Sequence, residues 1–159
     1  MRGFFGSFSR SLDSKNRVTL PAEWRDFMRA RDLPTDGDAE DLRQDTGFWM
    51  TSFYGRIVAY LPEKWSAIVE SLNRIPFPSR SLSNFKTKLI GLGQCVEPDA
   101  QGRLRIPQSL VREAGLSGVA MLVGMQEKIE IWDEARFDAI NIEDISAEEL
   151  SRQNIELSL

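Results

Sequence analysis

Two stretches of the sequence place an acid, an arginine and a proline at identical spacing. DSKNRVTLP runs from Asp13 to Pro21, and DAQGRLRIP runs from Asp99 to Pro107. Arginine has a planar fork of donors that suits bidentate contact with a phosphate group or a guanine edge. The preceding carboxylate can instead pair with that arginine across a turn, which contributes about 0–1 kcal/mol at a surface. The motif therefore allows two interpretations, a structural turn or an arginine directed at an anion.

The surroundings of the two motifs favour the second interpretation. For one isolated copy a paired surface turn is the simpler explanation, and a duplicated fold would duplicate its structural turns as well. The neighbourhood nevertheless carries more cations than a paired turn needs, namely Arg10, Lys15, Arg25, Lys86, Lys88 and Arg105. This excess predicts a surface that meets a polyanion.

The residues between the acid and the arginine are typical of a tight turn. Asp13 suits the first position of a type I turn, where its side chain caps the backbone. Asn16 and Gly102 hold the same place in the two copies, and both tolerate the left-handed conformation that a three-residue hairpin loop needs there. Each loop is therefore predicted to form a rigid hairpin that projects Arg17 or Arg103.

Two related halves of the chain must position these turns. After each turn, apolar residues alternate with basic or polar ones, which predicts a strand with one face in the core. A proline then begins a short amphipathic helix, in PAEWRDFMRA and in PQSLVREAGL, and Gly115 suits the end of the second helix. A strand pair follows in each half, FWMTSF with IVAYL and VAMLVG with IEIW, and another short helix completes the unit.

Large apolar residues show where the core is expected. Between the halves, SLSNFKTKLIGLG predicts a helix that buries Leu82, Phe85 and Leu89. The tryptophans could stack on bases, but core or strand spacing favours packing for most of the four, which are Trp24, Trp49, Trp65 and Trp132. Two alternatives stay open for Phe4, Phe5 and Phe8, which could cover a subunit interface or form an added strand on the first hairpin.

Composition excludes several classes of protein. A chain of 159 residues with 42% apolar residues fits one compact domain, or two small halves that share a core. The sequence has no histidine, which removes the His-based acid–base and nucleophile sets and the usual zinc and iron ligands. Gly91 and Gly93 lack the Lys-Ser/Thr of a phosphate loop, and the acidic run at 36–41 lacks the spacing of a calcium loop.

Location is predicted from the same features. No run of 18 apolar residues is present, and the N-terminus lacks the apolar core and cleavage site of a signal peptide. A single cysteine, Cys95, cannot form an internal disulfide, which fits a reducing cytoplasm. We therefore expect a cytoplasmic protein without contact to a membrane.

The net charge of −4 conceals a strong segregation of charges. Residues 1–31 carry seven Lys/Arg against three Asp/Glu, and residues 74–112 carry seven against two. Residues 32–45 carry one against six, and residues 127–159 carry three against ten. Both motifs lie in basic blocks, and the local field governs binding because the Debye length is about 8–10 Å. The acidic average is therefore compatible with nucleic-acid binding.

The chain closely resembles the MraZ family of bacterial transcriptional regulators, which is related to the AbrB-type DNA-binding barrels. The matching elements are FFGSF, LDSKNRVTLPAEWR, LPEKW, DAQGRLRIPQSLVREAGL and VAMLVGMQEKIEIWDEARF. The resemblance implies an α+β, mainly β fold, an intertwined AbrB-like barrel with swapped hairpins, built from two internal repeats with short flanking helices. The expected division is a first repeat at 1–78, a linker helix with the second repeat at 79–140, and an acidic, mobile tail at 141–159.

The resemblance also implies a function. It predicts a sequence-specific regulator of the division and cell-wall gene cluster, associated with the nucleoid, that binds direct repeats of double-stranded DNA in its own promoter. A ring-shaped homo-oligomer, an octamer or larger, would present the hairpins, without cofactor, metal or small-molecule substrate. The DNA-binding residues expected from the motif are Asp13, Lys15, Arg17, Asp99, Arg103 and Arg105.

Two other classes of function remain as alternatives. An enzyme could use Asp–Arg pairs on a phosphorylated or carboxylated substrate, although the sequence offers no convincing nucleophile. A structural or protein-binding ring could use the apolar N-terminus and the acidic tail, and it would show no preference for promoter DNA.

Overall fold

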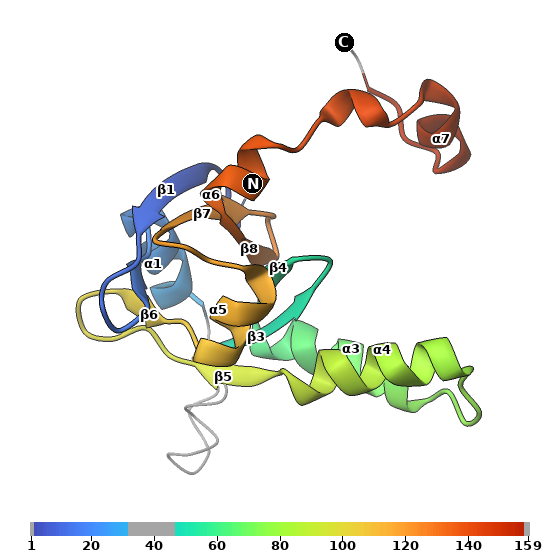
Figure 1. Cartoon of the computed structure of the whole chain (residues 1–159), viewed down its shortest axis with the longest axis horizontal. Coiled ribbons are helices and arrows are strands. Elements are labelled where there is room, and N and C mark those ends of the chain that lie inside the picture. Colours follow the sequence, from blue (N-terminus) through green and yellow to red (C-terminus); the bar gives the residue numbers. More distant parts are fainter. Residues whose placement is uncertain (1, 32–46, 158–159) are drawn as a thin grey trace.

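The computed structural model of the chain describes residues 2–31 and 47–157 (Figure 1). The first half contains four strands and two helices among these residues. In chain order they are β1 (Ser7–Ser11), β2 (Arg17–Thr19), α1 (Ala22–Arg29), β3 (Phe48–Phe53), β4 (Arg56–Tyr60) and α3 (Pro62–Asn73). The acidic loop at 32–45, including the run at 36–41, lies outside the described residues.

The second half repeats this order after a connecting helix, α4 (Arg80–Gly91). Its elements are β5 (Gln94–Val96), β6 (Arg103–Arg105), α5 (Gln108–Ala114), β7 (Val119–Gly124), β8 (Lys128–Asp133) and α6 (Glu134–Asp138). The predicted order of strand, turn, strand, helix, hairpin and helix is therefore confirmed in both halves. As expected, Gly115 ends α5 in the left-handed conformation, with φ of 62°.

Antiparallel pairing organises the strands into two sheets. One sheet has six strands in the order β1-β7-β8-β4-β3-β5, and the other is a ribbon of β2 and β6. The pairs β1–β7, β4–β8 and β2–β6 each join a strand of the first half to a strand of the second. This confirms an α+β fold with a mainly antiparallel sheet, whereas the closed barrel with swapped hairpins stays a prediction.

The predicted local hairpins need a correction at both motifs. Each turn is closed by its own backbone hydrogen bonds, but the strands on either side of it pair with other strands. β1 lies beside β7, and β2 lies beside β6. A short strand of three residues gains little from its sequence neighbour, and burial of its apolar face against the other half decides the partner.

One core extends through both halves. Val18 and Leu20 after the first turn, and Leu104 and Ile106 after the second, are all buried in it. Trp24 from α1 joins them. The alternation read from the sequence thus places the apolar side chains inward and leaves the polar and basic residues of β2 and β6 outside.

The aromatic residues divide between core and surface. Trp24 and Trp65 are buried, while Trp49, which stacks on Trp65, and Trp132 are half-buried. Packing is confirmed as the main role of the first two. Near the N-terminus, Phe4 is buried in the core and Phe5 is exposed. Phe8 of β1 packs edge-on against Trp24 of α1. Of the three phenylalanines only Phe8 lies in a strand, β1, which pairs with β7 of the second half, so the described residues add no further strand to the first hairpin. A role at a subunit interface stays a prediction.

The expected burial of the connecting helix is wrong for two of its three residues. In α4 only Leu89 of the three predicted residues is buried, and Phe85 is exposed, because much of α4 extends beyond the sheet (Figure 1). The acidic tail at 141–159 contains a short 3-10 turn, η1 (Ile142–Asp144), and a helix, α7 (Ala147–Arg152), and its mobility stays a prediction. Among the described residues, no helix has both the length and the apolar character that crossing a bilayer requires.

Candidate nucleic-acid interface

The two turns have the same backbone geometry. In the first, the N–H of Asn16 donates to the carbonyl of Asp13 at 3.0 Å, and in the second the N–H of Gly102 donates to that of Asp99 at 2.9 Å. Asn16 and Gly102 are both left-handed, with φ of 58° and 76°. The prediction that asparagine and glycine support one common turn is confirmed.

Each aspartate organises its turn through both carboxylate oxygens. Oδ1 of Asp13 accepts from the backbone N–H of Lys15 at 2.9 Å and of Arg17 at 2.8 Å, and Oδ2 accepts from Nε of Arg17 at 2.6 Å. Asp99 repeats the pattern, with Oδ2 accepting from Nε of Arg103 at 2.8 Å. The pairing interpretation of the motif is therefore correct as geometry, in both copies.

The same contacts favour the charged form of both aspartates. The backbone N–H of Arg17 and then its side chain lower the pKa of Asp13 to about 2, against the opposing effect of desolvation. The equivalent contacts from Arg103 lower the pKa of Asp99. Both carboxylates are thus ionised at neutral pH, and each holds its arginine by the Nε edge.

This arrangement leaves the outer end of each arginine available. Arg17 has no hydrogen bond through its Nη nitrogens to any described residue, and Arg103 has one, from Nη2 to Oε1 of Gln101 at 3.4 Å. Guanidinium groups carry five N–H donors, so most donors of the Nη edge stay open to an acceptor outside the protein. A carboxylate behind an arginine fixes its direction and so prepares it for bidentate recognition.

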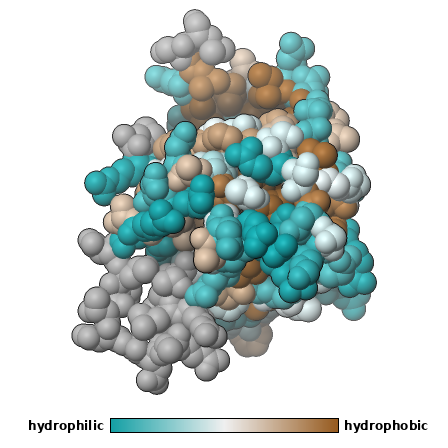
Figure 2. Space-filling view, turned by 90° about the vertical axis from the view of Figure 1, so that its left-hand side faces the viewer, coloured by the Kyte–Doolittle hydropathy of each residue, from teal (hydrophilic) through white to brown (hydrophobic). Residues whose placement is uncertain are grey.

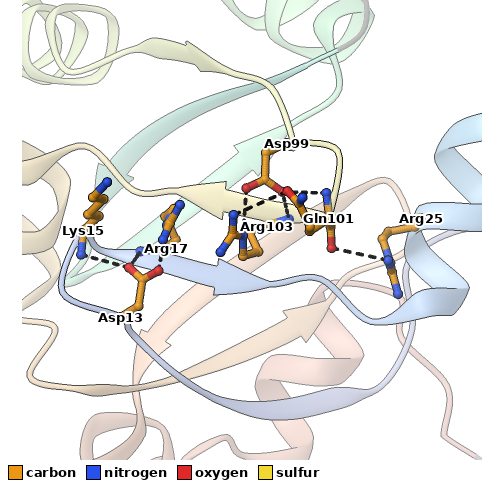
Figure 3. Close-up of polar contacts among 7 residues, drawn as sticks. All are labelled: Asp13, Lys15, Arg17, Arg25, Asp99, Gln101 and Arg103. Carbon is orange, nitrogen blue, oxygen red and sulfur yellow. Dashed lines mark hydrogen bonds and ion pairs between the residues drawn. The ribbon is translucent and has the colours of Figure 1, made fainter.

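The ribbon of β2 and β6 brings both motifs onto one face. In the register of the ribbon Arg17 lies opposite Arg105, and Thr19 lies opposite Arg103. Val18 and Leu104 lie opposite each other between them and face the core. The two turns lie at opposite ends of this ribbon, because the strands are antiparallel. Figure 3 shows Arg17 and Arg103 between the two aspartates. The face of the molecule that carries α1 and β6 is largely hydrophilic (Figure 2).

The six residues predicted from the motif are placed as follows. Asp13, Arg17, Asp99 and Arg103 form the two turn networks, and Arg105 extends from the same ribbon face and is exposed. Lys15 is exposed at the tip of the first turn. The structure therefore brings all six to the ribbon and its ends, and their contact with DNA stays a prediction.

The other cations noted in the sequence lie in different places. Arg10 from β1 donates through Nε to the carbonyl of Thr19 at 3.2 Å, which ties β1 to the ribbon. Lys88 from α4 forms an ion pair with Glu113 at 3.3 Å, and Lys86 is half-buried on the same helix. The α4 lysines thus do not belong to the ribbon face.

Each turn is supported by the helix that follows the other motif. Nδ2 of Asn16 donates to Oε1 of Gln108, at the start of α5, at 2.8 Å. At the second turn, Arg25 of α1 donates through Nη1 to the carbonyl of Gln101 at 3.5 Å, and its side chain fills the space beside Gly102. Sequence reasoning counted Arg25 only as a surface cation and missed Gln108. Neither role has a local signal, since both depend on the crossed pairing of the halves.

Comparison with known proteins adds a family to this geometry. Residues 90–156 match the family model described as "MraZ protein, putative antitoxin-like". This range includes the second turn, β6 and the C-terminal helix α7.

Curated relatives extend the similarity to nearly the whole chain. A transcriptional regulator MraZ of Nitratidesulfovibrio vulgaris, strain Hildenborough, is 35% identical over 155 residues, which cover 96% of this chain and 97% of the relative. The transcriptional regulator MraZ of Maridesulfovibrio salexigens is 34% identical over 157 residues, 97% of each chain. That of Acetivibrio thermocellus is 28% identical over 151 residues, 94% of this chain and 95% of the relative. The chain therefore belongs to the MraZ family.

Proposed function

We propose that the protein is a transcriptional regulator that binds double-stranded DNA through the outward face of the β2–β6 ribbon. The observation that carries this proposal is the placement of Arg17, Arg103 and Arg105 on that one face. A two-stranded ribbon fits the major groove of B-DNA, where arginine is the most frequent partner of guanine. The names of the relatives, which are transcriptional regulators, support the same function.

A purely structural role explains this face less well. Like charges placed directly opposite each other destabilise an antiparallel pair, and Arg17 stands opposite Arg105. Two Asp–Arg pairs would close the turns without the third arginine. A polyanion in front of the ribbon relieves the repulsion, because Asp13 and Asp99 offset only Arg17 and Arg103 and leave the charges of Lys15 and Arg105 for phosphates to meet.

Membership of the MraZ family supports a more specific proposal about the genes that are controlled and the oligomer that binds them. We propose that the protein controls the division and cell-wall gene cluster from the nucleoid, by binding direct repeats in its own promoter. The fold would be an intertwined barrel with swapped hairpins, and a ring of eight or more copies would present its ribbons to successive repeats. Each ribbon offers few contacts, and linking them raises apparent affinity by about 10²–10⁴ without a new type of contact.

Fluorescence anisotropy tests the DNA contact. The labelled probes are the region upstream of the chain's own gene and a base-shuffled duplex of equal length. Arg17→Ala and Arg103→Ala should each weaken binding to the upstream probe, and binding of the wild type should fall steeply with salt. Light scattering on the same samples gives the number of subunits and checks that the variants keep it.

Arg74→Ala is the matched control, because Arg74 is an exposed arginine held by a carboxylate, Glu70, at the end of α3. It should bind as the wild type does. Unchanged binding after both Arg17→Ala and Arg103→Ala would overturn the proposed interface. Equal binding of the two probes by the wild type would favour a structural or protein-binding ring.

A further inference from the structure

The two turns share a backbone but differ at their tips. Lys15 occupies the tip of the first turn, and Gln101 occupies the same place in the second. The backbone N–H of each donates to Oδ1 of its own aspartate, at 2.9 and 3.0 Å. The scaffold is thus equivalent, and the side chains that it presents are chemically different.

We propose that the two turns do different work on the same DNA, the first binding a backbone phosphate and the second reading a base edge. The inference rests on the proposed function and assigns a task to each end of its ribbon. It makes Lys15 a phosphate-binding residue and Gln101 a positioning residue that acts through Arg103.

The surface beside the first turn has the chemistry of an anion site. A hollow of ≈ 630 Å³ lies there between the turn and the start of α5. Two cations, Lys15 and Arg105, line it together with polar neutral side chains that include Ser14 and Gln108. None of the described residues that line it is an acid. A phosphate needs positive charge and donors but little orientation, which is what an ammonium on a flexible stem provides.

The surface beside the second turn has mixed charge. The hollow there, ≈ 320 Å³, is lined by Arg25, Arg29 and Arg31, but also by Glu97 and Asp99. Arg31 is additionally engaged by the carboxylate of Glu63, at 2.6 Å from its Nη2. This hollow thus has acids among its cations, unlike the first one, and it offers a poorer site for a phosphate.

What the second turn offers instead is a fixed guanidinium. Nε of Arg103 is held by Asp99 at 2.8 Å, and Nη2 contacts Oε1 of Gln101 at 3.4 Å. The backbone carbonyl of Gln101 accepts from Nη1 of Arg25 at 3.5 Å, which ties the turn itself to α1 (Figure 3). Arg17 has the first of these restraints and not the second, since a lysine at the tip offers no acceptor. Bidentate contact with a base edge depends on such orientation, so Arg103 is the better reader of sequence.

Two matched substitutions test the difference, Lys15→Met and Gln101→Met. Both side chains are exposed, and the same unbranched residue replaces each, so the turn hydrogen bonds from the backbone remain. Anisotropy with the upstream and the shuffled duplex, repeated over a series of salt concentrations, gives two quantities. They are the ratio of the two affinities and the slope of log K against log salt.

Lys15→Met should weaken binding of both duplexes by the same factor and reduce the salt slope by about 1 for each turn engaged, with the affinity ratio unchanged. Gln101→Met should lower the ratio by about 5–10-fold, within the range of one bidentate base contact, and leave the salt slope unchanged. Lys15→Arg, which keeps the charge, should restore the slope.

The outcomes separate the two proposals. Equal effects of the two methionine variants, or effects exchanged between them, overturn the division of work while the proposed function stands. If Arg17→Ala and Arg103→Ala leave binding unchanged, the proposed interface fails and the division of work fails with it. Circular dichroism of the two methionine variants should match the wild type, since neither side chain is buried.

Discussion

Arg17 and Arg105 occupy one rung of the β2–β6 ribbon, opposite each other on its outward face. On the next outward rung Thr19 lies opposite Arg103. The two rungs therefore differ at one position, which holds Arg105 in the first rung and Thr19 in the second. Opposed cations cost stability in an antiparallel pair. The face is therefore better matched to an anion than to the isolated protein.

Replacing Arg105 with threonine makes both rungs alike and separates stability from binding. The free energy of unfolding in urea should stay unchanged or rise by about 0.2–1 kcal/mol, because a like-charge pair is removed. Affinity for the upstream duplex should fall. The reverse change, Thr19→Arg, adds a cation to the same face and should raise affinity for shuffled DNA. An Arg105→Thr variant that binds DNA as the wild type does would contradict the role of this rung.

Gly102 is required by its neighbour Arg25 as much as by its backbone. Its φ of 76° is close to that of Asn16, so asparagine suits the conformation, but a Cβ at this position would overlap Cδ of Arg25. We expect Gly102→Asn to cost about 1–3 kcal/mol in the wild type, as overpacking does. In an Arg25→Ala background the cost should shrink to below about 0.5 kcal/mol. A double-mutant cycle in urea measures this coupling, and additive effects would show that the two residues act separately.

Crossed support of this kind marks the limit of what the sequence predicts. The composition of the turns, the alternation after them and the prolines were sufficient to predict both left-handed residues and the inward position of Val18 and Leu104. These features are local, because a turn type or a strand face is set by a few adjacent residues. The partner of a strand is not, and the pairing of β2 with β6 depends on burial shared by two distant segments.

The α4 helix shows the same limit from another side. Its apolar spacing predicts a buried stripe, yet Phe85 is exposed and Leu89 is buried. Spacing tells which side chains share a helix face, but not how far the rest of the protein extends along that face. In the candidate site, the same reason hid Gln108 and the role of Arg25, which come from elements that only the fold brings to the turns.

Acid should weaken the turns in a defined window. Asp13 has its pKa lowered to about 2 by the N–H and side chain of Arg17, and the pKa of Asp99 is lowered by the equivalent contacts. Because the pKa of Asp13 is lower in the folded state than its unfolded value of 3.8, the ionised carboxylate stabilises the fold at pH values above 3.8. This stabilisation is lost as the pH falls from about 4 to about 2.

The double variant Asp13→Asn with Asp99→Asn tests this window. Asparagine keeps an oxygen to accept from the backbone but loses the charge that pairs with arginine. The free energy of unfolding of the double variant should be lower than that of the wild type at pH 7, and this difference between the two proteins should close toward pH 2. Urea unfolding at each pH measures it. Parallel curves with a constant gap would show that the charge of these groups is not the cause.

A partly buried ion pair on the large sheet offers a test of stability away from the ribbon. Nε of Arg56 on β4 lies 3.3 Å from Oε2 of Glu130 on β8, and its guanidinium lies over the ring of Trp132, 4.9 Å from the centroid. Oε1 of Glu130 accepts from Nε1 of Trp132 at 3.0 Å. Glu130 is 7% exposed, so its charge is largely withdrawn from water and depends on these partners.

Glu130→Gln retains an oxygen for Trp132 and leaves Arg56 without its counter-charge. We expect a loss of about 1–3 kcal/mol in urea unfolding, the range for leaving a buried polar group without its partner. Burial and then the charge of Glu130 raise the pKa of Tyr60, so the same variant should lower the pKa of that phenol in an ultraviolet titration. Glu127→Gln is the control, because Glu127 pairs with Lys64 at the exposed surface, and it should cost at most about 1 kcal/mol. DNA affinity of the folded Glu130→Gln variant should equal that of the wild type, and a large drop in affinity would mean that the sheet and the ribbon are coupled.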